Sequence, residues 1–238
     1  MAYSDLSTLL RDSVGIQHPP VALAFVDQQP DGITTTKATR APSSCSFWRA
    51  AETEVFYASA ADHGGCAVGA YVMGFPLSEQ TAGELAAALK LMAEVGYVPE
   101  SEVASIPTAA RSGAGVVYGP LADFPLEPSA VLVWVTPAQA MVLEEALKTT
   151  AWKGTQADGQ GVFGRPACGA VAQAVNSRNS AFSLGCAGMR TFTEIPPELS
   201  LLVIPSAALP ALTADLQQIQ DANTKMLDYY KARQRAFA

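Results

Sequence analysis

The chain has few charged residues and no cluster of basic ones. Charged side chains make up 16% of its 238 residues, against about 25% in an average globular protein. The formal net charge is −7, from 22 acidic and 15 basic residues. The densest basic run, residues 231–235, closes the last expected helix, where the helix dipole favours cations. Because nucleic-acid binding needs clustered Lys and Arg to neutralise phosphates, no nucleic-acid partner is expected.

Long apolar runs are also missing, although 49% of the residues are hydrophobic. No stretch approaches the ~18 consecutive apolar residues that span a bilayer. Residues 1–15 carry acids where a secretory signal needs basic residues and then an apolar run. The high apolar content excludes a disordered chain, which combines low hydrophobicity with high charge. We therefore expect a cytoplasmic protein with no membrane partner.

The common catalytic motifs are absent as well. There is no CxxC pair, G-x-S-x-G, P-loop or H-E-x-x-H segment. The only histidines are His18 and His63, which excludes a multi-histidine zinc or di-iron centre. The glycine-rich stretch 154–164 follows no clear strand and lacks the dinucleotide-binding fingerprint.

Apolar periodicity predicts strands that alternate with helices. Strands are expected at 21–26, 55–59, 116–119, 130–135 and 201–204, and helices at 5–14, 81–96, 138–148, 205–216 and 212–235. Thr81 and Glu84 form an expected capping box. A strand, a proline and a helix follow one another at both Pro137 and Pro205. These patterns predict an α+β (or α/β) fold with two related halves, about 1–112 and 113–238, packed into one compact unit.

The four cysteines have informative neighbours. They are Cys45, Cys66, Cys168 and Cys186, and three of them adjoin a glycine. The sequence Gly-Cys-Ala occurs twice, each time followed closely by another glycine. The glycines concerned are Gly65, Gly69, Gly185 and Gly188. Glycine lets backbone N–H groups approach sulfur or a bulky ligand, so these four residues are expected to border a cofactor.

Three interpretations of the cysteines compete. Four buried, reduced thiols are plausible, since free cysteine is among the most buried residue types. Two disulfides are disfavoured by the cytoplasmic expectation. The third interpretation is a zinc or iron–sulfur site with four thiolate ligands from both halves of the chain.

Longer segments point to a family. They include PPVALAF at 19–25, DHGGCAVG at 62–69, ACGAVAQAV at 167–175 and LGCAGMR at 184–190, together with a cysteine before an F-Y-A strand. On these segments, and over nearly its whole length, the chain resembles the DUF169 proteins of archaea and bacteria. The resemblance implies that all four cysteines lie at positions where that family has one, and it implies no particular activity. Four such cysteines favour a [4Fe–4S] cluster, with zinc or no metal as the alternatives.

Polar side chains near the cysteines are candidates for chemistry. His63 is expected to be a ligand, a proton donor or a hydrogen-bonding surface residue. Arg165 and Arg190 are expected to hold an anionic substrate or to form salt bridges. Tyr71 is a further catalytic candidate, although it and the nearby aromatic residues Phe47, Trp48 and Tyr57 are also expected in the core.

These candidates favour a redox or cluster-dependent enzyme that acts on a small molecule. An electron carrier that works with a redox partner protein, a sensor, and a cofactor-free protein all stay open. Cys45, expected in a serine-rich loop without glycine, is predicted to be the weakest ligand, and Cys66 and Cys186, each in a Gly-Cys-Ala turn, are predicted to be the least replaceable. No oligomeric state is predicted.

Overall fold

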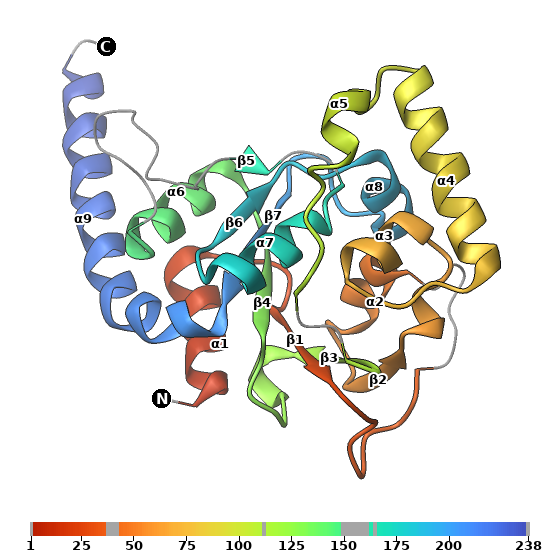
Figure 1. Cartoon of the computed structure of the whole chain (residues 1–238). Helices are drawn as coiled ribbons and strands as arrows, with labels where there is room; N and C mark the ends of the chain where they lie inside the picture. The colour runs from red at the N-terminus through yellow and green to blue at the C-terminus, as the bar shows by residue number, and fades with distance from the viewer. Residues whose placement is uncertain (1, 37–42, 111–112, 149–161, 164–165, 237–238) are drawn as a thin grey trace.

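The computed structural model describes residues 2–36, 43–110, 113–148, 162–163 and 166–236. In this part of the chain, helices cover both faces of a single central sheet (Figure 1). The expectation of one compact α+β unit is confirmed.

The sheet has seven strands in the order β2-β3-β1-β4-β7-β6-β5. Their bounds are β1 Val21–Val26, β2 Phe56–Ser59, β3 Gly115–Pro120, β4 Ala130–Val135, β5 Val162–Phe163, β6 Ala181–Ser183 and β7 Ser200–Pro205. All neighbouring strands are antiparallel except β5 and β6, which are parallel. The antiparallel pairing decides between the two expected fold classes in favour of α+β.

The helices form a layer on each side of the sheet (Figure 1). Their bounds are α1 Tyr3–Val14, α2 Ser44–Ala50, α3 Ala67–Val72, α4 Glu79–Glu94, α5 Glu100–Val103, α6 Pro137–Ala146, α7 Gly169–Ser177, α8 Ala187–Thr193 and α9 Leu209–Arg235. One layer contains α1, α6 and α9, and the other contains α2, α3, α7 and α8. Helix α4 packs on α3 from outside and has no fully buried residue.

Side chains that point alternately to the two faces of the central strands contribute to both layers of the core. In β4, Val131, Val133 and Val135 pack with α1, α6 and α9, whereas Leu132 and Trp134 pack with the opposite layer. Successive side chains of a strand point to opposite faces, so a strand that is apolar at every position suits a sheet covered on both sides. The layer that contains α2, α3, α7 and α8 carries all four cysteines.

The two strand–helix units lie beside each other. Strands β4 and β7 pair over their full lengths, and α6 packs against α9. Pro137 stands in the first turn of α6 as expected, but Pro205 ends β7, and Pro210 takes the corresponding place in α9. Strand β3, which follows position 112, lies between β1 and β2, so the two expected halves share one sheet.

Two helix expectations need correction. Helix α4 begins at Glu79 because the Ser78 hydroxyl accepts a hydrogen bond from Thr81 N at 3.1 Å, so the capping box expected at Thr81 is wrong. The helices expected at 205–216 and 212–235 are the single helix α9. The end of α9 beyond residue 223 is exposed, and no helix in the described ranges is long and apolar enough to cross a membrane.

Candidate metal centre

The four cysteines gather on one face of the sheet. Cys45 lies in the first turn of α2, and Cys66, Cys168 and Cys186 directly precede α3, α7 and α8. Each of the four thiols interacts electrostatically with the other three. None of them is in a disulfide. Residues far apart in the sequence therefore form one group, called here the four-thiol site.

Two of these cysteines cap helices with their sulfur atoms. Cys66 and Cys186 have extended backbones, and their Sγ atoms accept hydrogen bonds from Gly69 N and Met189 N, both at 3.4 Å. Serine and aspartate cap helices in the same geometry. Backbone hydrogen bonds of this kind also stabilise a sulfur ligand once it is bound to a metal.

The glycines near these cysteines have different roles. A Cβ atom on Gly69 would lie 3.5 Å from Cys66 Sγ and 3.8 Å from Ser44 Oγ, so this glycine leaves space at the four-thiol site. Gly185 has φ +91°, a conformation that other residues rarely adopt. A Cβ on Gly188 would meet only Phe192, at 3.9 Å, and Gly65 is exposed in the turn before Cys66.

Burial separates the cysteines into two pairs. Cys45 and Cys168 are 4% and 3% exposed, whereas Cys66 and Cys186 are half-buried. Burial, and secondarily the neighbouring thiols, raise the pKa of Cys45 and of Cys168 well above the ordinary value. Burial also raises the pKa of Cys66. These three thiols are protonated at neutral pH, so a metal must displace protons to bind them.

The expectation that Cys45 lies in a loop is wrong. Ser43 caps α2 by accepting a hydrogen bond from Ser46 N at 3.3 Å, and the helix therefore starts before the cysteine. Cys45 is one of the two most buried thiols. Cys66 and Cys186, which are half-buried, are the more accessible thiols of the four.

His63 is fully buried, so of its three expected roles that of a surface residue is wrong. Its Nδ1 lies 2.7 Å from Ser59 O and its Nε2 lies 2.9 Å from the Tyr118 hydroxyl. Because a carbonyl only accepts, Nδ1 carries the proton, and Nε2 accepts from the phenol. The rings of Phe47 and Phe75 pack on the imidazole, and burial lowers the pKa of His63 to about 4. The ring is neutral, and both nitrogens are engaged.

The other catalytic candidates lie in three different settings. Arg190 donates to Pro196 O at 3.1 Å and to Leu184 O at 2.7 Å, so its guanidinium holds the turn around Cys186. Tyr71 is 40% exposed on α3, which corrects the expectation that it belongs to the core. Arg165 lies outside the described residues. Phe47, Trp48 and Tyr57 are buried as expected.

Three residues near the site were not anticipated. The Tyr118 phenol interacts with Cys45 and Cys168, and burial raises its pKa. Ser44 Oγ is buried beside Gly69. The Tyr97 hydroxyl accepts a hydrogen bond at 2.7 Å from the backbone N–H that follows Cys186. Of these three residues, only Ser44 could have been proposed from the sequence, because it directly precedes a cysteine.

The thiols approach one another without forming a single-ion site. Within the described residues, no three His, Cys, Asp or Glu side chains are grouped so that they could hold a metal ion.

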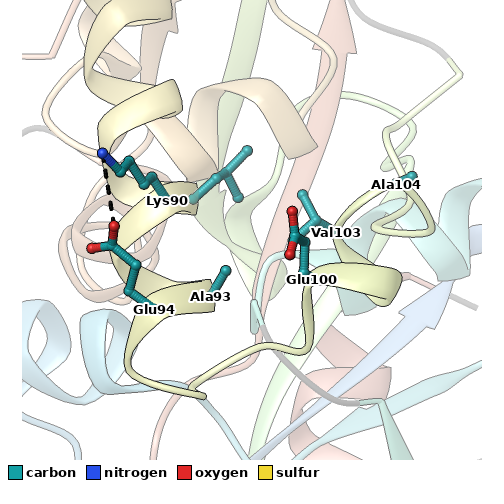
Figure 2. Close-up of a pocket in the computed structure, with 7 residues that line it drawn as sticks. Lys90, Ala93, Glu94, Glu100, Val103 and Ala104 are labelled. Carbon is teal, nitrogen blue, oxygen red and sulfur yellow. Dashed lines mark ion pairs between the residues drawn. The ribbon is translucent and has the colours of Figure 1, made fainter.

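A separate hollow of about 650 Å³ lies between α4 and α5 and is lined by Leu89, Lys90, Ala93, Glu94, Glu100, Val103 and Ala104 (Figure 2). Lys90 and Glu94 form an ion pair at its edge at 3.7 Å. No cysteine lines this hollow.

The fold and the four-thiol site define an α+β protein with four cysteines grouped on one face of a mostly antiparallel sheet. The chain belongs to the DUF169 family, described as uncharacterised ArCR, whose model matches residues 9–215. All four cysteines fall within the matched range. No curated protein and no solved structure matches the chain.

The buried His63 predicts an acid-dependent loss of stability in the metal-free protein. In the unfolded chain this imidazole binds a proton near pH 6.5. In the folded chain it binds one only near pH 4, because burial lowers its pKa. The neutral His63 therefore makes its full contribution to the free energy of unfolding above pH 6.5. This contribution falls by up to about 3 kcal/mol as the pH drops to 4. Urea unfolding of wild type and His63→Gln over this range measures the difference. The variant should have a shallower pH dependence, and equal slopes would contradict the assignment.

Proposed function

We propose that the protein binds one iron–sulfur cluster, [4Fe–4S], through Cys45, Cys66, Cys168 and Cys186. The observation that supports this most is the proximity of all four thiols, which come from four separate segments of the chain and pack in or against one core cluster. Four cysteine thiolates are the usual ligand set of such a cluster. Zinc needs every sulfur about 2.3 Å from one ion, whereas a cluster spreads its ligands over four irons and accepts more widely spaced thiols.

The surroundings of the sulfurs support a bound cofactor better than inert thiols. Cys66 and Cys186 each accept a backbone N–H, which an uncharged thiol that only fills space does not need. Gly69 leaves space beside Cys66 Sγ. Hydrogen bonds to ligand sulfur and the polarity of the surroundings set the stability and potential of a cluster.

The pattern of burial gives the proposed centre an inner and an outer edge. Cys45 and Cys168 would hold the cluster against the core, and Cys66 and Cys186 would hold the edge that faces solvent. When bound, a cluster supplies one-electron transfer, and it would supply a Lewis acid only if Cys66 or Cys186 released its iron to a substrate. We therefore favour a cytoplasmic redox or cluster-dependent enzyme that acts on a small molecule at this outer edge.

An electron carrier or sensor with a closed four-cysteine site is the second candidate. It is favoured by the state of His63 and Arg190, whose hydrogen-bonding groups are engaged with Tyr118 and with backbone carbonyls. Neither side chain is then free to act as an acid or to bind a substrate anion. The partner in this case is a redox protein rather than a small molecule.

Reconstitution with iron and sulfide tests the proposed ligands. Wild type prepared without oxygen should hold about four irons and four sulfides per chain and absorb broadly in the visible range. Cys45→Ala and Cys168→Ala should lose the cluster, because a buried ligand has no replacement from water. Cys66→Ser and Cys186→Ser should keep a partial, three-iron cluster that electron paramagnetic resonance detects. A colourless wild type without iron or sulfide contradicts the proposal, and zinc retention would keep the ligands and remove the redox role.

Gly69 provides a sharper test of the cofactor's position. Gly69→Ala adds a methyl group at ordinary contact distances, 3.5 Å from Cys66 Sγ and 3.8 Å from Ser44 Oγ. Alanine is the better helix former by about 1 kcal/mol, so the metal-free variant should be as stable as wild type or more stable. Its iron content after reconstitution should fall, because the methyl group occupies space at the site.

Gly188→Ala is the matched control for this experiment. It also adds a methyl group to a short helix after a cysteine, but the nearest atom is Phe192 Cε2 at 3.9 Å. Its iron content should equal that of wild type. If both variants bind iron as wild type does, no cofactor lies against Gly69.

A further inference from the structure

Ser44 carries a buried hydroxyl whose hydrogen-bonding capacity is unused. The residue is 1% exposed at the start of α2, and its Oγ makes no hydrogen bond with any described residue. The preceding Ser43 differs, since its hydroxyl caps the helix through Ser46. A buried polar group without a partner costs about 1–3 kcal/mol. Such a group indicates a hydrogen-bond partner that is bound in the functional protein and is not part of the described chain.

The position of this hydroxyl indicates where that partner lies. The point where Gly69 would carry a Cβ is 3.8 Å from Ser44 Oγ and 3.5 Å from Cys66 Sγ, so both atoms border the same space beside α3. Cys45 is the next residue along α2. Ser44 Oγ therefore lies at the four-thiol site.

The neighbouring phenol has no proton to give to Ser44. The Ser44 side chain lies near enough to Tyr118 to oppose the rise in the pKa of the phenol, as a hydrogen bond would, but the two hydroxyls do not meet the distance and angle limits of a hydrogen bond. Tyr118 donates its proton to His63 Nε2, because His63 uses its own N–H on the Ser59 carbonyl. The phenol oxygen can thus accept a further hydrogen bond but cannot donate one.

We propose that Ser44 Oγ donates a hydrogen bond to the sulfur-rich group that the four cysteines hold, and that Tyr118 and His63 are positioning residues for this contact. The inference rests on the proposed function, and its acceptor is a sulfide or thiolate sulfur. A hydrogen bond to cluster sulfur stabilises the reduced, more negative state, so it raises the midpoint potential. Ser44 then tunes the cluster without being a ligand.

The first arm of the test uses the metal-free protein. Ser44→Ala removes a hydroxyl without a partner, so its melting temperature should equal or exceed that of wild type. The matched control is Ser183→Ala, which removes a fully buried hydroxyl that accepts from Gly185 N at 3.1 Å. This control should melt at a lower temperature. A drop for Ser44→Ala as large as that for Ser183→Ala would show a partner within the chain and overturn the inference.

The second arm uses the reconstituted protein and redox titration followed by electron paramagnetic resonance. Ser44→Ala should have a more negative midpoint potential than wild type, or lose the cluster while its metal-free stability is unchanged. Tyr118→Phe should shift the potential in the same direction, and the shift should vanish when Ser44 is already alanine, because Tyr118 acts through Ser44.

The outcomes separate this inference from the proposed function. A wild type that holds no iron after reconstitution overturns both. A wild type that holds a cluster, with an unchanged potential in Ser44→Ala, overturns only the contact from Ser44. Equal shifts for Tyr118→Phe with and without Ser44 overturn the positioning role of Tyr118 and leave the contact in place.

Discussion

The burial of four thiols against one another is the constraint on which the rest of the site depends. Taking a thiol out of water disfavours its charged form, and neighbouring thiols disfavour it further. Such a group is stable as long as its members keep their protons, or as long as a metal compensates the charge of four thiolates. A cation bound there would release protons, so affinity for the metal should rise with pH. The same burial that keeps the free thiols inert gives a bound metal a shielded environment.

The fold satisfies this constraint by bringing together short helices from both parts of the chain. Helices α2 and α3 come before β3, and α7 and α8 come after β4, yet all four cover the same face of the sheet (Figure 1). The antiparallel pairing of β4 with β7 joins the first part of the sheet to the second. A cluster that bonds to all four helices would link these segments covalently, so its binding and the stability of this layer should be coupled.

The sequence predicted the features that depend on neighbouring residues, such as backbone N–H groups near sulfur and strand bounds, better than those that depend on long-range packing. The Gly-Cys-Ala pattern indicated backbone N–H groups near sulfur, and Gly69 N donates to Cys66 Sγ as expected. The strand at 21–26 was predicted from its apolar run and has those bounds. The start of α2 was missed because serines favour both loops and helix caps, and here Ser43 is a cap.

Long-range packing determined what the sequence could not predict. His63 stands in a polar turn, but Phe47 from α2 and Tyr118 from β3 enclose it and make it a buried, neutral residue. Tyr118 lies in a run of apolar strand residues, with no local sign that its hydroxyl connects His63 with the four-thiol site. Arg190 was expected to bind an anion or a carboxylate, but the turn around Cys186 brings two carbonyl oxygens to it instead.

X-ray absorption at the iron edge of the reconstituted wild type tests the central claim most directly. Sulfur atoms alone should surround the iron, and a strong iron–iron signal should accompany them, because four cysteines and bridging sulfides complete the coordination of a multi-iron cluster. A spectrum with nitrogen or oxygen neighbours and no iron–iron signal would mean that iron binds elsewhere, and would contradict the claim.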